Sequence, residues 1–297
     1  MKCKLQKIHF ILQKLNNCDI MKKREVNILN NDQEYSYKSK ELYFKHSITE
    51  DPACDSFYMH THSMYELLYF VSGDATFVIE DKRYKLNTGD LVLIRPMKYH
   101  YIQIDSSAIY ERYDILFDER ALRIDNTYKA EDSIEVINLI DRAVSCDIIK
   151  KLDYYAEKLS GEDFKDVTVS LIKELFYDLS IKKAHASKDI AHINPTLSKA
   201  LKYINDNLFT LKSISEVSDE IFVTESYLFR LFKSELKKSP KKYINDKRLL
   251  AAQNLIQMGE MPIAVYERCG FSDYTSFYRN YKEYFGYPPS KESEYTN

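Results

Sequence analysis

Between Glu41 and Asp118 the sequence alternates short apolar runs with turn-forming residues. The turns Ser72-Gly73-Asp74, Glu80-Asp81-Lys82 and Asn87-Thr88-Gly89-Asp90 separate runs that are rich in β-branched and aromatic residues. Closely spaced strands joined by tight turns are typical of an antiparallel sandwich or a small barrel. The pattern predicts six strands: Glu66–Val71, Ala75–Ile79, Arg83–Leu86, Asp90–Ile94, Tyr101–Ile104 and Tyr113–Phe117.

From Asp132 to Lys183 the apolar period becomes helical. A stripe at three- and four-residue steps predicts an amphipathic helix, which packs either on the strand domain or against a second copy of itself. No periodicity follows between Lys183 and Asn194, which indicates a linker. The stripe consists of Val167, Leu171, Leu175, Phe176 and Leu179.

After the linker the pattern predicts a second, all-helical domain. Asn194-Pro195 is an N-cap followed by proline at the first helical position, and an apolar stripe continues to Leu208. Ile214–Ile221 forms a short helix, and Thr224 caps a longer helix that should bury Tyr227, Leu228, Leu231 and Phe232. Two short helices joined by a tight turn are the layout of a helix-turn-helix.

This layout recurs about 49 residues later. Cys269-Gly270-Phe271 forms the turn, Ser272 is the expected cap, and Ser239-Pro240 begins a helix that joins the two units. In the second unit Val265 lies in the expected short first helix, and the expected inward residues are Phe277, Tyr281 and Phe285.

The net charge of −2, from 43 basic and 45 acidic residues, argues at first against a nucleic-acid partner. Counting the halves separately changes this, because the part from Asn194 onward has 15 basic and 13 acidic residues and the part before it has 28 and 32. Seven cations lie between Lys233 and Arg248. A run of like charge is more often a solvated surface, so it is weak evidence when taken alone.

The remaining composition indicates a cytoplasmic protein. Five scattered cysteines without a C-x-x-C pair fit a reducing compartment. No apolar run approaches the ~20 residues that cross a bilayer, and the N-terminal residues lack the apolar core of a secretion signal. We expect no membrane association, and either Met1 or Met21 as the true start.

The C-terminal motif resembles the AraC/XylS family of bacterial transcription regulators. The resemblance rests on Tyr227-Leu-Phe-Arg230-Leu-Phe-Lys233, on Arg248-x3-Ala252-x2-Leu255-Ile256, and on Gly270-Phe271 followed by Phe277, Arg279, Lys282, Phe285-Gly286 and Pro289-Ser290. It implies two helix-turn-helix units that enter two successive major grooves, ~34 Å apart. The implied partners are double-stranded promoter DNA, RNA polymerase and a second copy of the chain.

Carried over by position, the resemblance assigns seven residues to base reading. Arginine makes bidentate contacts to guanine, and Phe229 or Tyr278 can touch a thymine methyl group. The alternative for Phe229 is core packing, and for Arg230 it is a pair within its own helix. The base-reading residues are Ser226, Phe229, Arg230, Tyr274, Thr275, Tyr278 and Arg279, and the phosphate-contacting residues are Lys233, Lys237, Lys241 and Lys282, within a wider Lys237 to Arg248 cluster.

The sequence departs from the family pattern at three places, two of them in the second unit and one in the turn after the first unit. Tyr266 stands where the family usually has a small alanine, whereas Ser218 is a mild change at the matching position of the first unit. The segment Met261–Tyr266 is one residue short, which predicts a second unit that sits differently or binds more weakly. Lys237 stands where a turn glycine is common.

In the N-terminal half, His60-x-His62-x3-Glu66 with Gly73, and Gly89-Asp90-x5-Pro96-x3-His100, resemble the two motifs of the cupin barrel. In metal-bearing cupins the residues matching His60, His62, Glu66 and His100 bind Fe, Mn, Zn or Ni. An i, i+2 spacing on a strand puts both histidines on one face. The four residues form a metal site, line a metal-free effector pocket, or merely shape the barrel mouth; a divalent metal is not the favoured interpretation. Tyr65, Tyr69 and Tyr101 are candidate aromatic faces for a sugar-like effector.

The predicted fold is therefore multidomain α+β: an N-terminal cupin-like antiparallel β-barrel plus helices, and a C-terminal all-α domain with two helix-turn-helix units. The predicted function is a sequence-specific DNA-binding transcription regulator whose barrel senses a small molecule, without enzymatic activity. The alternative is a metal-dependent cupin enzyme with an accessory DNA-binding domain. The expected parts are an extension (1–35), the sensor barrel (36–120), a helical dimerisation segment (121–185), a linker (186–194) and the double helix-turn-helix domain (195–297).

Overall fold

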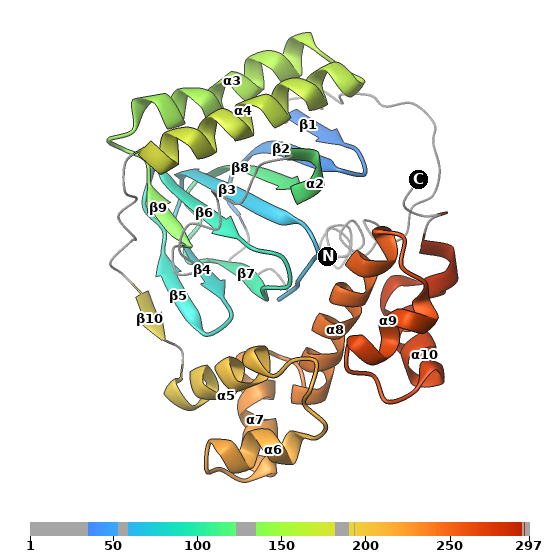
Figure 1. Ribbon diagram of the computed structural model, residues 1–297. Helices are drawn as coiled ribbons and strands as arrows, with labels where there is room; N and C mark the ends of the chain where they lie inside the picture. Colours follow the sequence, from blue (N-terminus) through green and yellow to red (C-terminus); the bar gives the residue numbers. More distant parts are fainter. Residues whose placement is uncertain are drawn as a thin grey trace. The chain divides into compact units, whose positions relative to one another are not determined.

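The computed structural model describes residues 35–52, 59–122, 135–181, 190–192, 194–292 and 294. The expected extension up to residue 34, both possible start residues and most of the expected linker lie outside the described residues. The described chain forms two compact units, with the division between Ala191 and His192 (Figure 1).

The N-terminal unit contains two antiparallel sheets. The larger has the order β1-β2-β8-β3-β6-β9 and the smaller the order β10-β5-β4-β7. The larger sheet comprises β1 (Tyr35–Lys38), β2 (Leu42–Thr49), β3 (Tyr65–Ser72), β6 (Asp90–Ile94), β8 (Tyr110–Phe117) and β9 (Val136–Asn138). The smaller comprises β4 (Ala75–Ile79), β5 (Lys82–Lys85), β7 (His100–Ile104) and β10 (Ile190–His192).

The six predicted strands are confirmed as β3 to β8, but the two sheets are not closed into a barrel. After β3 the chain crosses to the other sheet at Gly73, where φ is +130° and a Cβ would lie 3.1 Å from the ring of Tyr110. The bend at this glycine moves β4 out of the ladder that β3 forms with β6 and β8. The result is a two-sheet sandwich in the described residues, instead of the expected closed barrel.

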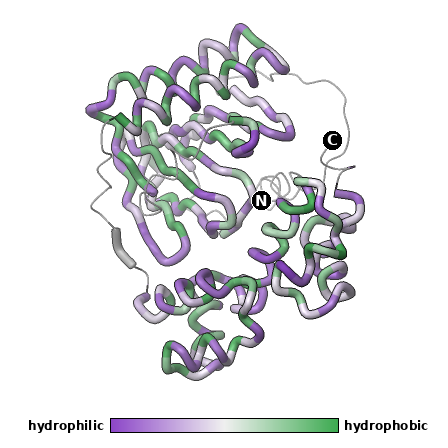
Figure 2. Tube along the Cα trace, in the orientation of Figure 1, coloured by the Kyte–Doolittle hydropathy of each residue, from purple (hydrophilic) through white to green (hydrophobic). Residues whose placement is uncertain are grey.

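Two apolar layers follow from the alternation of side chains along the strands. One lies between the sheets and includes Leu68, Phe70, Phe77 and Ile102. The other lies between the larger sheet and two helices, α3 (Ala143–Lys158) and α4 (Gly161–Ile181). Figure 1 shows both helices running across one face of the larger sheet, and Figure 2 shows hydrophobic and hydrophilic residues interspersed along these helices.

The predicted amphipathic helix is α4. Leu171, Leu175 and Phe176 are buried in the layer against the larger sheet, and Val167 and Leu179 are partly buried there. The stripe therefore packs on the strand domain and not against a second copy of the helix. A short helix, α2 (Glu119–Leu122), precedes this region.

The C-terminal unit is helical, as predicted. Asn194 caps its first helix by accepting a hydrogen bond from the Thr196 amide at 2.9 Å, and Ser239 caps the longest helix. Its elements are α5 (Pro195–Asp206), α6 (Ile214–Glu220), α7 (Glu225–Glu235), α8 (Pro240–Gln257), α9 (Pro262–Arg268), α10 (Tyr274–Phe285) and the 3-10 turn η2 (Pro289–Lys291). Helices α6 and α7 form one helix-turn-helix, α9 and α10 form the second, and α8 joins them.

Candidate functional site: two helix-turn-helix units and a buried histidine cluster

Helix α7 has one buried face and one exposed face. Leu228, Leu231 and Phe232 are buried, and Thr224 caps the helix with a hydrogen bond from the Tyr227 amide. The predicted base-reading residues Ser226, Phe229 and Arg230 are all exposed on the opposite face, together with Lys233. The helix thus presents these four side chains to solvent. Tyr227 was expected to be buried but is 39% exposed; it lies in the first turn of α7 and is not among the residues that the helix buries.

Phe229 is 48% exposed, so it is not a core residue. The ammonium group of Lys233 lies 5.8 Å from the centre of its ring, one helical turn away. This contact keeps an apolar ring at the surface beside a cation. The pair is suited to a surface that carries both apolar methyl groups and phosphates.

Helix α10 repeats this arrangement. Phe277, Tyr281 and Phe285 are buried as predicted, and Thr275, Tyr278, Arg279 and Lys282 are exposed. The N-cap is Asp273, whose carboxylate accepts from the Ser276 amide at 2.7 Å, and not the expected Ser272. The helix begins one residue later than expected because an aspartate caps more strongly when its charge adds to the helix dipole.

The two turns have the same pattern of backbone hydrogen bonds. The Val223 amide donates to the Ser218 carbonyl at 2.9 Å, and the Phe271 amide donates to the Tyr266 carbonyl at 3.0 Å. The second unit therefore forms despite Tyr266. Its side chain is partly exposed, and its ring meets that of Tyr274 edge-on with centres 5.8 Å apart. Tyr274 is accordingly the one base-reading candidate of α10 that is partly covered.

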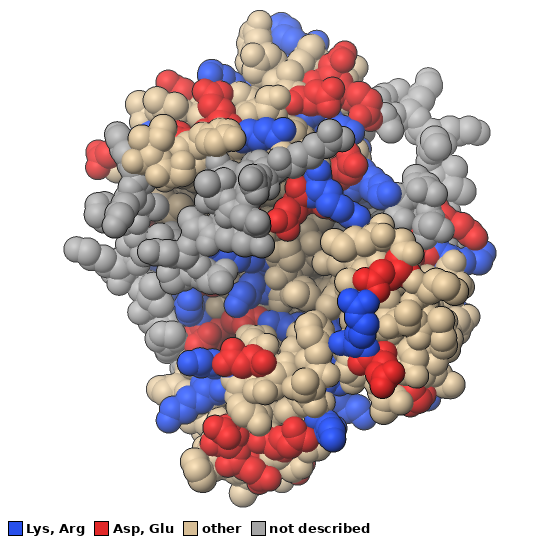
Figure 3. Space-filling model, viewed as in Figure 1, with Lys and Arg blue, Asp and Glu red and all other residues tan. Residues whose placement is uncertain are grey.

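The basic run from Lys233 to Arg248 is not one surface. Lys233, Lys237 and Lys241 are exposed, but Lys247 is only 3% exposed and Arg248 only 8% exposed. The prediction that the whole Lys237 to Arg248 cluster contacts phosphate is wrong for these last two residues, because both hydrogen bond inside the unit. Figure 3 shows basic and acidic side chains interspersed on the visible face of the C-terminal unit.

The second site is a cluster of three histidines and a carboxylate in the N-terminal unit. His60, His62, Glu66 and His100 each place a nitrogen or oxygen atom within 4.8 Å of all the others. His60 and His100 form an isolated antiparallel bridge, with amide-to-carbonyl distances of 3.1 and 2.9 Å. His60 and His62 do not share a continuous strand as expected, but they still converge because this bridge holds the chain beside β7.

Glu66 is the centre of this cluster. One of its oxygens, Oε2, lies 2.8 Å from Nε2 of His62 and 3.1 Å from Nε2 of His100. Glu66 as a whole is 8% exposed. Burial alone would raise the pKa of Glu66, but the charge and hydrogen bonds of His100 and His62 outweigh it and hold the pKa well below its ordinary range.

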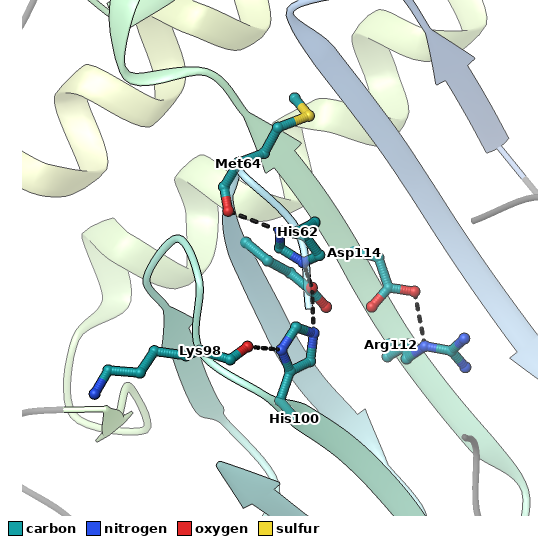
Figure 4. A network of polar contacts seen from close by, with 7 residues as sticks. His62, Met64, Lys98, His100, Arg112 and Asp114 are labelled. Atoms are coloured by element: carbon teal, nitrogen blue, oxygen red, sulfur yellow. Dashed lines mark hydrogen bonds and ion pairs between the residues drawn. The ribbon is translucent and has the colours of Figure 1, made fainter. Parts of the chain in front are cut away.

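On the side of the ring away from Glu66, His62 and His100 each hydrogen bond to a backbone carbonyl (Figure 4). Nδ1 of His62 lies 2.8 Å from the Met64 oxygen, and Nδ1 of His100 lies 2.9 Å from the Lys98 oxygen. Because a carbonyl only accepts, both Nδ1 atoms carry hydrogen, and a neutral ring then points its Nε2 lone pair at Glu66. A proton or a metal cation is needed to offset the repulsion between these lone pairs and the carboxylate.

The donor set therefore fits a divalent transition metal. Imidazole nitrogens with one carboxylate are ligands for Fe, Mn, Zn or Ni, and a metal-binding histidine commonly donates its other N–H to a carbonyl. His60, His62, Glu66 and His100 are the residues that would hold such an ion. The same atoms can equally hydrogen bond a polar small molecule.

A partly buried ion pair extends the polar region along β8. Nε of Arg112 donates to Oδ2 of Asp114 at 2.7 Å, and the guanidinium lies 4.7 Å from the centre of the Tyr110 ring. Burial raises the pKa of Asp114, Arg112 opposes this rise, and the charge of Glu66 adds to it. In Figure 4 the pair lies beside the histidines.

Arg112 and Asp114 were not among the predicted site residues. The sequence does hold a signal for them, because they alternate with the core residues Tyr113 and Ile115 and so must face away from that core. In the register of the larger sheet Asp114 is opposite Leu68, two residues from Glu66 on the same face. The carboxylates and Arg112 thus share the face that is turned toward the smaller sheet.

The three tyrosines proposed as aromatic faces for an effector do not lie there. Tyr69 is buried, and Tyr65 partly buried, in the layer under α3 and α4, and the ring of Tyr65 stacks on that of Phe117. Tyr101 alternates with His100 and Ile102, so it lies on the opposite face of β7. Alternate side chains of a strand point to opposite faces, and these three tyrosines lie on the faces away from the histidines.

Two family models match separate parts of the chain. A helix-turn-helix domain model matches residues 217–294, and an AraC-like ligand-binding domain model matches residues 48–124. The chain belongs to the AraC family of transcription regulators. It accordingly has a ligand-binding N-terminal domain and a helix-turn-helix DNA-binding domain. No described helix of this AraC-family chain is long and apolar enough to span a membrane.

Similar AraC-family regulators span most of the chain. It is 23% identical to the lactose operon transcription activator of Staphylococcus xylosus over 77% of this chain and 83% of that protein. It is also 23% identical to the Msm operon regulatory protein of Streptococcus mutans, over 90% of this chain and 97% of that protein. Among solved structures, ToxT of Vibrio cholerae with a bound unsaturated fatty acid is 13% identical over 93% of this chain and 97% of that chain, with a TM-score of 0.36.

Proposed function

We propose that this regulator binds promoter DNA with α7 and α10 in two successive major grooves and that a small molecule bound between the two sheets controls this binding. The observation that carries the proposal is the matched design of the two helices. Each buries an apolar face, aliphatic and aromatic in α7 and aromatic in α10, and exposes a mixed face with an arginine, an aromatic residue and a lysine at corresponding places.

The base-reading residues are those on the exposed faces, namely Ser226, Phe229 and Arg230 on α7, and Tyr274, Thr275, Tyr278 and Arg279 on α10. The guanidinium groups are suited to guanine, and the aromatic rings to thymine methyl groups. Lys233, Lys237, Lys241 and Lys282 are exposed and are suited to phosphate. The near balance of charge in the unit supports specific base contacts over strong non-specific binding.

The effector site is the polar region around Glu66 and Arg112. Burying ionised groups between two sheets costs stability unless each is paired, so a protein that keeps them there has a use for them. Carboxylates, imidazoles and a guanidinium together suit a small molecule with several hydroxyl groups, such as a sugar. To act as a switch, this molecule must bind two arrangements of the DNA-binding unit with different affinities.

A second copy of the chain is the expected partner of α3 and α4. Their outward faces carry exposed Val144, Tyr154, Tyr177 and Ile181. We infer a homodimer in the cytoplasm that contacts RNA polymerase when bound at a promoter. Its role is regulation and not catalysis, as for its relatives, which are transcription regulators.

The second candidate function is a metal-dependent cupin enzyme with an accessory DNA-binding domain. The observation that favours it is the convergence of four ligand atoms within 4.8 Å. The ligands alone do not define a reaction, because one fold serves many functions.

Selection of bound sequences from a random DNA pool tests the proposal. The expected result is a motif with two elements about one helical turn apart, bound with an affinity that falls steeply with salt. A protein that selects no sequence would contradict DNA recognition. Unchanged DNA affinity and spacing in the presence of every small molecule recovered from the host would contradict effector control.

A further inference from the structure

Helix α8 joins the two helix-turn-helix units and is buried on several sides. Ten of its 18 residues are buried, and they include the consecutive charged residues Asp246, Lys247 and Arg248. Helices α7, α9 and α10 all pack against it. A charged segment at this depth needs partners within the protein.

Arg248 has three partners, and all are backbone carbonyls. Its Nε donates to the Leu208 oxygen at 2.8 Å, one terminal nitrogen donates to the Leu211 oxygen at 2.6 Å, and the other donates to the Gly270 oxygen at 2.6 Å. Leu208 and Leu211 lie between α5 and α6, ahead of the first helix-turn-helix. Gly270 lies in the turn of the second. One side chain therefore connects the segment that leads into the first helix-turn-helix to the turn of the second.

No carboxylate pairs with Arg248 in the described part of the chain. Burial lowers the pKa of the guanidinium, which nevertheless stays charged, since arginine is not deprotonated in proteins. Its charge is therefore balanced by the three carbonyl dipoles alone. The planar fork fixes their directions, which a lysine would not do.

Gly270 makes this contact sterically feasible. Its φ is +82°, and a Cβ at this position would lie 2.7 Å from Cζ of Arg248 and 2.7 Å from the Phe209 carbonyl oxygen. The turn of the second unit is thus packed directly on the guanidinium. The corresponding residue of the first unit, Phe222, also has a positive φ of 58°, but it is 93% exposed.

Other polar contacts hold α8 on both sides. Nζ of Lys247 donates to Oδ1 of Asn205 on α5 at 2.8 Å, and Nε2 of Gln253 donates to the hydroxyl of Tyr287, beyond α10, at 3.3 Å. Neither contact joins the segment between α5 and α6 to the turn of the second helix-turn-helix. Only Arg248 bonds to segments on either side of α8 at once, among the described hydrogen bonds.

We propose that Arg248, packed on Gly270, is a positioning residue that sets the distance and angle between α7 and α10, and thereby the base-pair spacing that this regulator accepts. The inference rests on the proposed function, in which both helices enter major grooves. Inserting one base pair moves the second groove by about 3.4 Å and turns it by roughly 35°. A fixed pair of helices cannot follow such a change without breaking contacts.

The experiment starts from the two-element site that the full-length wild-type protein selects. Binding is measured on this site and on versions with one or two base pairs inserted or deleted between the elements, and on each element alone. The expected wild-type loss is about tenfold or more for a single inserted pair, equivalent to about 1.4 kcal/mol. Equal binding at all spacings would overturn the inference.

The variant Arg248→Met keeps an apolar stem and removes all three donors. We expect it to bind an element alone within about twofold of wild type, to lose about tenfold on the two-element site, and to discriminate less between spacings. Arg268→Met is the matched control, since Arg268 is an exposed arginine on α9 paired with Glu260. It should keep the wild-type spacing profile.

Circular dichroism and thermal unfolding check that each variant folds. If Arg248→Met does not fold, Arg248→Lys keeps the charge but not the fork, and a weakened spacing preference in this variant supports the inference. A folded Arg248→Met or Arg248→Lys protein with an unchanged spacing profile overturns it. A wild-type protein that binds no DNA overturns the proposed function itself, whereas one that binds single elements without spacing preference overturns only the positioning role.

Discussion

Phe222 and Gly270 occupy the same backbone position in the two helix-turn-helix units, 48 residues apart, and both are in the left-handed region with φ of 58° and 82°. Each follows the short first helix of its unit, and each amide donates to a carbonyl three residues earlier, that of Asp219 at 3.2 Å or of Glu267 at 2.8 Å. The two environments differ, because Phe222 is almost fully exposed and Gly270 is packed on Arg248.

Opposite effects on stability are expected at these two positions. Phe222→Asn should raise the free energy of unfolding by about 0.5–1 kcal/mol, because asparagine tolerates this conformation and no buried contact is lost. Gly270→Ala should lower it by more than the ~1–2 kcal/mol of left-handed strain, because its Cβ also meets a backbone oxygen. Urea unfolding followed by circular dichroism measures both. A less stable Phe222→Asn protein would mean that the ring has a partner in the fold.

Lys237 should show a similar strain while affecting DNA binding separately. It has a φ of 55° just after α7, at the position where the family pattern has glycine. Lys237→Gly should raise the free energy of unfolding by about 0.5–1 kcal/mol. Its DNA affinity should fall slightly at the same time, through loss of a phosphate contact. Lys233→Gly is the control, since it lies inside α7 and should lower stability by about 1 kcal/mol.

Arg230 and Lys233 lie on the same exposed face of α7 but should differ in their effect on specificity. Arg230→Ala should cost about 1–3 kcal/mol of binding on the selected site and relax base preference at one position. Lys233→Ala should weaken binding to all sequences alike and reduce the salt dependence. Mobility shifts on the selected site and on random DNA separate these outcomes. Equal losses on both DNAs for Arg230→Ala would contradict its base-reading role.

His46 should make the N-terminal unit sensitive to pH. Its Nδ1 lies 3.0 Å from Asp153 on α3, its Nε2 lies 3.0 Å from Glu111 on β8, and its ring stacks on Tyr113. Burial alone would lower the pKa of His46, but the hydrogen bonds and charges of Asp153 and Glu111 outweigh it and raise the pKa above its ordinary value of 6.5.

Because the folded pKa is the higher one, the stabilisation is fully present below about pH 6.5 and is lost as the pH rises through the folded pKa. The difference in unfolding free energy between wild type and His46→Gln should therefore be largest below about pH 6.5 and shrink as the pH rises through the folded pKa of His46. Asp153→Asn should weaken the same dependence. A difference that grows with pH would show that His46 is neutral in the folded protein.

The histidine cluster should be able to bind a transition metal whether or not it does so in the cell. Added Zn²⁺ or Ni²⁺ should raise the thermal unfolding midpoint of wild type, because an ion that binds only the folded state stabilises it. His60→Ala/His62→Ala should lose this response, and His46→Gln should keep it. If metal analysis of the purified wild type finds no ion and added metal changes nothing, the enzyme alternative loses its basis.

Side-chain alternation and turn residues were enough to predict β3 to β8, and spacing motifs were enough to find His60, His62, Glu66 and His100. The strands β1, β2, β9 and β10 were not predicted. Tyr35–Lys38 is largely polar, and Val136–Asn138 is only three residues long, so neither carries a clear period. These strands form through pairing, β1 with β2, β2 with β8 and β9 with β6, which a local pattern does not encode.

Burial of charge was the other property that the sequence concealed. Lys247 and Arg248 end a run of surface lysines, and nothing in their local pattern distinguishes them from Lys241. Their position is decided by carbonyls and an amide some 22 to 42 residues distant. Arg112 is the opposite case. Because it alternates with the core residues of β8, its position along the strand predicts that its side chain faces the other way, once the core face of the strand is known.

Glu292 lies beyond α10 and hydrogen bonds to α8 and to α10 of the second helix-turn-helix. This residue, just after η2, is 1% exposed; its carboxylate accepts from Gln257 of α8 at 2.8 Å and from the hydroxyl of Tyr281 of α10. During synthesis, the first helix-turn-helix can fold while α10 is still being made. The buried contacts of the second are complete only after Glu292 has left the ribosome, so we expect a nascent chain to finish one DNA-binding unit before the other.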